Sequence, residues 1–205
     1  PLELARAYCV FAGGGILPHP LSIKDVTDDH GGLLSQAHLN IERLISPAEA
    51  YIMTDMLKSV VSEGTARALS GWNLPGPVAG KTGTTNNFRD AWFVGYTPDI
   101  LALVWVGFDN GDPILATGYS AALPIWAEII RAIPHQVSGA AFKPPPTVVK
   151  HDICIRNGFP DVTGGCAAIG EEWFQADNVP EDDPILVKAQ SPWYRFWHGL
   201  KGDNR

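Results

Sequence analysis

The spacing of apolar residues divides the first part of the chain into a helix and a long extended segment. Residues 1–12 carry apolar side chains at helical spacing, which are Leu4, Tyr8 and Phe11. The run that begins at Gly13 is predicted to end this helix, because glycine readily adopts the left-handed conformation beyond a helix C-terminus. Residues 16–28 are predicted to be extended, with strand-like alternation at 21–26. A turn is expected at 28–32.

A second helix is predicted to begin at Ser46-Pro47-Ala48-Glu49. The serine suits the N-cap, the proline suits the first helical position, and the glutamate can close a capping box. Gly64 is expected to end the helix. Its apolar stripe is predicted to contain Ile52, Met56, Leu57 and Val60, with Met53 also in the core. Trp72 follows in the next connection, where we expect a packing anchor rather than a residue lining a cleft.

Three strand-like runs follow at residues 81–85, 89–96 and 100–108. In the second run Trp92, Val94 and Tyr96 are predicted to share one face, with Phe93 and Gly95 on the other. The third run is apolar on both faces, as in a central strand that is covered on two sides. Short turns between the runs predict an antiparallel sheet. A last helix is expected at 120–133, with an apolar side made of Ile125, Trp126, Ile129, Ile130 and Ile133.

Length and composition fit one packed domain with an appendage. The chain has 205 residues, of which 45% are hydrophobic and 18% charged. The formal net charge of −7 argues against a nucleic-acid partner. No apolar run reaches the length of about 18 residues that a membrane span needs. The predicted boundary lies at Lys143-Pro144-Pro145-Pro146, which separates a domain at 1–143 from a Pro-rich linker and Cys-containing tail at 144–205.

The chemistry is concentrated in Gly80-Lys81-Thr82-Gly83-Thr84-Thr85. A phosphate-binding P-loop requires a further glycine five residues before Gly80, and that position holds Pro75. A P-loop also leads into a helix, whereas the residues that follow here are predicted to form a strand. The interpretation of these residues as a phosphate-binding loop is therefore rejected.

The remaining reading is a Lys-Thr-Gly strand beside a substrate cleft. Lys81 would place a positive charge near a substrate carboxylate and help proton transfer. Thr82, Thr84 and Thr85 would offer hydroxyl hydrogen bonds, and the backbone N–H near Thr84 could form half of an oxyanion hole. Gly83 lacks a side chain, so a substrate can approach the backbone closely. Taken alone, the motif also fits an ordinary exposed strand with a solvated lysine.

The flanking residues distinguish these readings. Arg89-Asp90-Ala91-Trp92-Phe93-Val94-Gly95-Tyr96-Thr97-Pro98 follows the motif, and Met53-Thr54-Asp55-Met56-Leu57 and Gly64-Thr65-Ala66 precede it. Together with the motif, these runs resemble the transpeptidase domain of class A penicillin-binding proteins, the bifunctional peptidoglycan synthases. The resemblance implies an α+β fold with an antiparallel sheet flanked by helices. It also implies that Lys81 is catalytic and that Thr82, Gly83, Thr84 and Thr85 bind substrate.

The same resemblance implies the reaction and its setting. The family cross-links peptidoglycan stem peptides through an acyl-serine intermediate and binds β-lactams. It acts outside the cytoplasm, anchored by an upstream segment that precedes a glycosyltransferase domain. No cofactor is implied. Arg89 and Asp90 are expected to be structural residues at the base of the Lys-Thr-Gly strand.

The chain departs from the family pattern in one respect. No serine has lysine three residues later, and none has asparagine two residues later, so Ser-x-x-Lys and Ser-x-Asn are both absent. We therefore expect the nucleophile in a missing upstream half of the domain, and the fragment alone to be inactive. The alternatives are a non-catalytic cell-envelope binding module of the same fold, or a hydrolase of the D,D-carboxypeptidase or β-lactamase type.

Three cysteines are present. Cys9 lies on the first predicted helix and is expected to be a buried small apolar residue. Cys154 and Cys166 are candidates for a disulfide in the extracytoplasmic setting that the resemblance implies, but spacing alone leaves the bond open. Neither this pair nor the turn-like Asp109-Asn110-Gly111-Asp112 has the ligand pattern of a zinc or calcium site, so no metal is expected.

Overall fold

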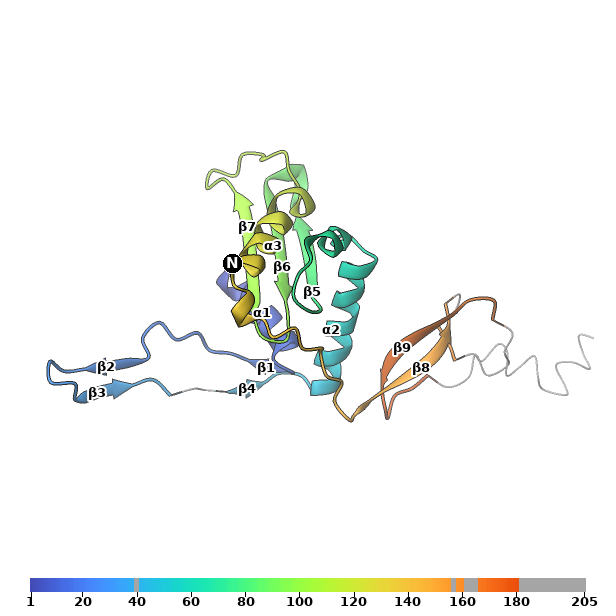
Figure 1. Cartoon of the computed structure of the whole chain (residues 1–205), viewed down its shortest axis with the longest axis horizontal. Coiled ribbons are helices and arrows are strands. Elements are labelled where there is room, and N and C mark those ends of the chain that lie inside the picture. Colours follow the sequence, from blue (N-terminus) through green and yellow to red (C-terminus); the bar gives the residue numbers. More distant parts are fainter. Residues whose placement is uncertain (39–40, 156–157, 161–165, 181–205) are drawn as a thin grey trace, which may run out of the picture. The chain divides into compact units, whose positions relative to one another are not determined.

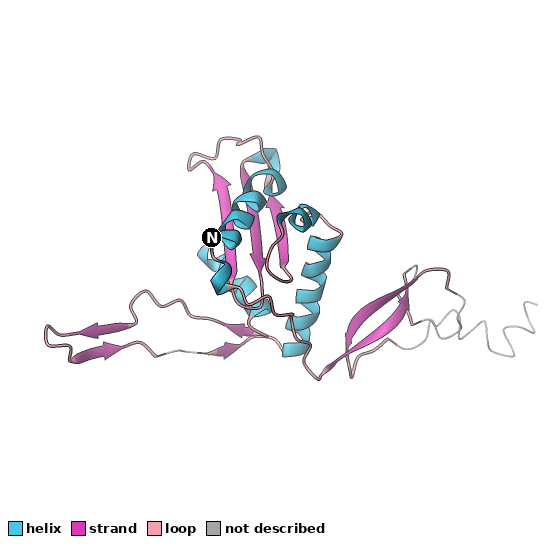
Figure 2. Cartoon of the chain, in the orientation of Figure 1, coloured by secondary structure: helices cyan, strands magenta, loops and turns pink. Residues whose placement is uncertain are grey.

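The computed structural model describes residues 1–38, 41–155, 158–160 and 166–180 (Figures 1 and 2). The chain divides into two compact units, one spanning residues 1–145 and one beginning at Pro146. The first unit combines helices with antiparallel sheets, and the predicted α+β class is confirmed. No helix in the described ranges is both long and apolar enough to cross a membrane.

The centre of the first unit is a three-stranded antiparallel sheet. It consists of β5 (Ala79–Thr84), β6 (Asp90–Tyr96) and β7 (Leu101–Gly107), in that order. The central strand is therefore β6. The prediction that residues 100–108 form a central strand is wrong for the described chain, because β7 lies at an edge. Its apolar character on both faces reflects the helices that cover the faces and says nothing about a neighbour at the edge.

The two faces of the sheet carry different helices (Figures 1 and 2). On one face, Tyr96 and Ala79 pack against α1 (Leu2–Ala12) and against Leu57 of α2 (Pro47–Ser62). On the other face, Phe93 and its neighbours pack against α3 (Leu123–Ala132). The predicted alternation along β6 is confirmed.

The face beneath α3 is organised by Trp126, which is fully buried. Its Nε1–H donates to the carbonyl oxygens of Gly95 at 3.2 Å and Ala102 at 3.0 Å, which tie α3 to β6 and β7. A Cβ on Gly95 would lie 2.8 Å from the Trp126 ring, so only glycine allows this approach. Ile125 and Ile129 are exposed although the sequence pattern placed them on the apolar side.

The predicted start of α2 is confirmed. The Ser46 Oγ accepts the Glu49 N–H at 3.2 Å, and the Ser46 N–H donates to the Glu49 carboxylate at 2.7 Å. These hydrogen bonds hold the pKa of Glu49 below its ordinary value. The capping box fixes where the helix begins.

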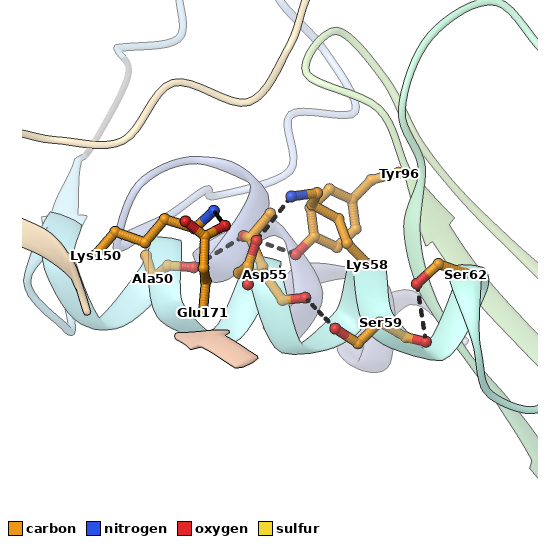
Figure 3. Close-up of polar contacts among 9 residues, drawn as sticks. Ala50, Asp55, Lys58, Ser59, Ser62, Tyr96, Lys150 and Glu171 are labelled. Atoms are coloured by element: carbon orange, nitrogen blue, oxygen red, sulfur yellow. Dashed lines mark hydrogen bonds and ion pairs between the residues drawn. The ribbon is translucent and has the colours of Figure 1, made fainter. Parts of the chain in front are cut away.

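The predicted apolar stripe of α2 is wrong at the two methionines. Met53 and Met56 are 37% and 60% exposed, whereas Ala50, Tyr51 and Thr54 are buried. The Thr54 Oγ1 donates to the Ala50 carbonyl at 2.8 Å and shares a 2.9 Å hydrogen bond with the Tyr96 hydroxyl (Figure 3). Because apolar residues lie on several sides of α2, spacing alone did not determine which side is buried.

Residues 16–45 form two short antiparallel pairs. They are β1 (Ile16–Leu17) with β4 (Glu42–Arg43), and β2 (Asp25–Thr27) with β3 (Leu33–Gln36). The turn at 28–32 is confirmed, because the Asp28 carboxylate accepts the N–H groups of His30 at 2.9 Å and Gly32 at 2.6 Å. Only the end of the predicted alternating run at 21–26 is strand.

Short helical turns join the larger elements. They are η1 (Arg67–Trp72), η2 (Asn86–Phe88), η3 (Gly118–Ala122) and η4 (Pro134–Gln136). Trp72 packs against the core beneath α3, and the Arg131 guanidinium lies 5.9 Å from the centre of its ring. Its expected role as a packing anchor is confirmed.

The second unit contains the antiparallel pair β8 (Val148–Cys154) and β9 (Ile169–Gln175). Cys154 and Cys166 form a disulfide, which settles the pairing that the sequence left open. Lys150 of β8 and Glu171 of β9 form an ion pair across the two strands (Figure 3). In the first unit, Cys9 is a free thiol on α1 and is only partly buried; this partial burial raises the pKa of its thiol.

Candidate functional site

Four of the five predicted site residues, Lys81 to Thr84, lie on β5, an outer strand of the three-stranded sheet, and Thr85 follows directly. Just beyond the strand, the Thr85 N–H donates to the Asp90 carbonyl at 3.1 Å and therefore points toward β6. Successive N–H groups of a strand alternate in direction, so the Thr84 N–H points away from β6, toward the open edge. The Thr82 carbonyl also lies on this edge, where it accepts the Lys81 ammonium at 2.9 Å.

Lys81 is exposed and has no carboxylate partner among the residues that the structure describes. It borders a hollow of about 280 Å³ beside β5. Trp92 and Val94 of β6 line this hollow together with Leu4 and Tyr8 of α1. The Tyr8 phenol is neutral at physiological pH, as an ordinary tyrosine is, and partial burial raises its pKa further. The hollow therefore combines apolar walls with an ammonium that has no carboxylate partner in the described ranges.

Thr82 points to the other face of the sheet from Lys81, in register with the fully buried Phe93, but both residues border the hollow at the edge of β5. Its Oγ1 lies 2.8 Å from the Oγ1 of Thr65, in the connection between α2 and η1. The sequence pattern included Thr65 only within a run that carried the family resemblance. The structure brings its hydroxyl to the predicted substrate-binding strand.

Gly118, the first residue of η3, packs against Gly83 and Thr84 of β5. The Gly118 N–H donates to the Thr84 Oγ1 at 3.0 Å. A Cβ on Gly118 would lie 2.5 Å from the Gly83 carbonyl oxygen and 2.4 Å from that of Trp92. The backbone of Gly118 therefore packs directly on β5 and β6. Because the Thr84 hydroxyl accepts this bond, its own proton remains available to a ligand.

Thr85 closes the turn between β5 and β6. Its hydroxyl donates to the Asp90 carboxylate at 2.9 Å and accepts the Asp90 N–H at 2.9 Å. The other carboxylate oxygen of Asp90 accepts the Trp105 Nε1–H at 2.9 Å. Asp90 thus links the end of β5 to β7 at the base of the site, which is the structural role expected of it. The substrate-binding role of Thr85 stays a prediction.

Sequence reasoning located the strand but missed the residues that support it. Gly118 and Thr65 are distant from the motif in sequence, and no local pattern links either residue to it. Only the three-dimensional arrangement identifies these contacts.

A larger hollow, of about 540 Å³, lies away from the motif between α2 and η1. Asp55, Lys58, Ser59 and Ser62 are among the residues that line it. Figure 3 shows these four side chains on α2, with the ion pair of Asp55 and Lys58 at 2.7 Å. The hydroxyls of Ser59 and Ser62 donate to backbone carbonyls of α2 itself. None of the predicted site residues borders it, so the candidate site remains the edge of β5.

Comparison with known proteins identifies the family of the chain. The family model described as "Penicillin binding protein transpeptidase domain" matches residues 1–131. The chain belongs to this family. Penicillin-binding protein 1A of Aquifex aeolicus is 40% identical over 148 residues, which cover 71% of this chain. Penicillin-binding protein 1A of Neisseria lactamica is 39% identical over 156 residues, which cover 73%. The matched parts are 20% and 19% of those relatives, so the chain spans about a fifth of their length.

Solved structures give the same family. Penicillin-binding protein 1A from Haemophilus influenzae superposes with a TM-score of 0.77 at 26% identity, covering 88% of this chain and 32% of that one. PonA1 from Mycobacterium tuberculosis superposes with a TM-score of 0.56 at 28% identity, covering 71% and 40%. Penicillin-binding protein A from M. tuberculosis, solved as an imipenem acyl-enzyme complex, gives 0.52 at 27% identity, covering 64% and 30%. The sheet and helices described above are thus those of a penicillin-binding transpeptidase domain.

Proposed function

We propose that this chain supplies the Lys-Thr-Gly strand of a D,D-transpeptidase that cross-links peptidoglycan stem peptides. The observation that carries the proposal is the open edge of β5. There an ammonium without a carboxylate partner among the described residues, a backbone N–H directed away from the sheet and two threonine hydroxyls lie beside one hollow. Membership of the penicillin-binding transpeptidase family supports the view that this edge takes part in acyl transfer.

The reaction requires a serine nucleophile, and no Ser-x-x-Lys occurs in these 205 residues. A serine from a segment outside them attacks the carbonyl carbon of the D-Ala-D-Ala bond. The terminal D-Ala leaves as an amine after it receives a proton, and the donor peptide remains as an acyl-serine ester. An amine of a neighbouring stem peptide then attacks the ester and restores the serine.

The β5 edge stabilises this chemistry through charge and hydrogen bonds. The Thr84 N–H polarises the reacting carbonyl, because it points out of the sheet where negative charge develops. Lys81 attracts the terminal carboxylate and assists proton transfer. The hydroxyls of Thr82 and Thr84 bind that carboxylate, and Gly83 leaves room for the peptide to lie against the strand. Thr85, whose hydroxyl proton is donated to Asp90, borders the same edge and holds the end of the strand.

The proposed ligands and location follow the family. β-Lactams occupy the same edge as the donor peptide and acylate the same serine. The protein acts outside the cytoplasm, held at the membrane by a segment outside this chain, where a glycosyltransferase domain also lies. The disulfide between Cys154 and Cys166 is compatible with an oxidising compartment.

Covalent labelling with a fluorescent penicillin, read by intact mass, tests the proposal. Two proteins are compared: this chain, and the natural protein's domain including the segment that carries Ser-x-x-Lys. We expect a mass increase of one penicillin in the longer protein and none in the 205-residue chain. Replacing the Ser-x-x-Lys serine with alanine is the control and should abolish the label.

The other outcomes separate the alternatives. A folded longer protein that does not react with penicillin would point to a non-catalytic envelope module. Rapid release of the acyl group to water, with no transfer to an added amine, would indicate a carboxypeptidase or β-lactamase. Labelling of the short chain would reveal a reactive serine within it and contradict the proposed division of the site.

A further inference from the structure

The connection between α2 and η1 reaches the candidate site through one hydrogen bond. The Thr65 Oγ1 lies 2.8 Å from the Thr82 Oγ1, and Thr65 is exposed. Thr65 is outside the Lys-Thr-Gly motif and seventeen residues before Thr82. It contacts a predicted substrate-binding side chain without belonging to the strand that carries it.

A hydrogen bond between two hydroxyls uses only one of their two protons. If Thr82 donates to Thr65, the Thr82 proton is not available to a ligand carboxylate. If Thr65 donates, Thr82 accepts with a lone pair and keeps its own proton for the ligand. The direction of this hydrogen bond therefore determines whether Thr82 offers a ligand at the edge of β5 a proton or only a lone pair.

We propose that Thr65 is a positioning residue that donates to Thr82 and so orients the Thr82 proton toward an anionic ligand beside Lys81. This inference rests on the proposed role of Thr82 in binding the substrate or β-lactam carboxylate. An approaching carboxylate favours this direction, because a carboxylate can only accept the Thr82 proton. Thr65 thereby contributes to carboxylate recognition without touching the ligand.

The backbone around Thr65 holds its hydroxyl in place. A Cβ on the preceding Gly64 would lie 2.9 Å from the Val60 Cα and carbonyl oxygen, so glycine permits close packing on the end of α2. The following Ala66 is fully buried, and its N–H donates to the Val60 carbonyl at 3.1 Å. Thr82 is fixed in turn by its register in β5. Both hydroxyls are thus preorganised, which lowers the entropic cost of aligning them with a ligand.

A purely structural role would be a tie between the α2–η1 connection and β5. Loss of such a tie would change the acylation rate with every ligand and also the stability of the domain. Loss of the proposed role would change the rate only for ligands that have a carboxylate. The test therefore compares a penicillin that has its free carboxylate with the methyl ester of the same penicillin. The protein is the complete domain that includes the Ser-x-x-Lys segment, and acylation rates are measured for each compound.

Three variants are compared with the natural protein. Thr65→Val keeps the shape but removes the hydroxyl, and Thr65→Ser keeps the hydroxyl. Ser62→Ala is the matched control, because the Ser62 hydroxyl donates to the Ser59 carbonyl within α2 (Figure 3). We expect Thr65→Val to slow acylation by the carboxylate compound about tenfold and to leave the ester rate unchanged. Thr65→Ser should restore the rate, and Ser62→Ala should leave both rates unchanged.

A double-mutant comparison isolates the coupling. In a Thr82→Val background, Thr65→Val should have no further effect on the carboxylate compound. Equal slowing of both compounds by Thr65→Val, or no slowing of either, would overturn the positioning role and leave the proposed function intact. If the natural domain is not acylated at all, the proposed function fails and this inference fails with it.

Discussion

The two outer strands of the central sheet, β5 and β7, pair with the same neighbour but differ in composition. Strand β5 reads Ala-Gly-Lys-Thr-Gly-Thr, with a buried beginning and a more exposed end. Strand β7 reads Leu-Ala-Leu-Val-Trp-Val-Gly and is apolar on both faces. Both antiparallel ladders run in continuous register along β6.

The difference shows what each edge is suited to bind. Small and polar residues on β5 leave its backbone accessible and place a cation and hydroxyls around it, which suits a polar ligand. Strand β7 flanks its open edge with apolar side chains and has no charged residue within its span, which is the character of a strand that pairs with another strand. Composition, rather than position in the sheet, distinguishes a ligand-binding edge from a pairing edge.

The largest expected effect on stability comes from Gly118, which packs against the ligand-binding strand β5. Gly118→Ala would force a Cβ to within 2.5 Å of the Gly83 and Trp92 carbonyl oxygens. We expect a loss of roughly 2–3 kcal/mol in the free energy of unfolding, measured by urea denaturation, because β5 must move. Gly71→Ala is the control, since nothing lies within 4 Å of a Cβ there. Equal stability of the two variants would show that Gly118 does not constrain β5.

The second prediction concerns the pairing edge. We expect this chain to self-associate through β7, and Leu103→Lys to shift it toward monomer, because a charge on an edge strand opposes strand pairing. Sedimentation velocity measures the effect as a loss of the dimer or of larger species. Ile129→Lys on α3 is the control, because it introduces the same charge at an exposed apolar residue that lies outside the sheet. A monodisperse monomer of the unaltered chain would contradict the assignment of β7 as a pairing edge.

A smaller, pH-dependent effect is expected at Tyr96, which joins β6 to α2. Burial raises its pKa to about 12, although the hydrogen bond with Thr54 acts in the opposite direction. An unfolded tyrosine ionises near pH 10, so the stabilisation by the neutral phenol is fully present below pH 10. It is lost as the pH rises toward 12. Urea denaturation between pH 8 and 12 should therefore show falling stability across that window.

Tyr96→Phe tests this assignment. The variant should be about 1 kcal/mol less stable at pH 7, because Thr54 loses a partner, and its stability should fall less steeply between pH 10 and 12. Tyr119→Phe, at an exposed tyrosine, should retain the natural profile. An unchanged slope in Tyr96→Phe would assign the alkaline loss to another group.

How much the sequence could predict depended on whether the signal was local. The start of α2 depends on residues within one turn of each other, and the alternation along β6 depends on neighbouring residues, so both were predictable. The buried side of α2 was not, since Met53 and Met56 compete with Tyr51 and Leu57 for the core and tertiary packing decides between them.

The site divides in the same way. Lys81 and its neighbours are contiguous and were identified from the motif. The supports, Thr65 and Gly118, come from segments that meet β5 only in the fold. The edge position of β7 was also unpredictable, because an apolar strand has the same pattern whether one or both of its edges are paired.

The central claim is that the β5 edge binds and activates the acyl donor. The most direct test is the rate of acylation by a fluorescent penicillin in the complete domain, comparing Lys81→Ala with Lys24→Ala. Both changes remove one exposed lysine, but only Lys81 borders the hollow beside β5. We predict a loss of about a hundredfold for Lys81→Ala and no change for Lys24→Ala. A normal rate of acylation in Lys81→Ala would contradict the account.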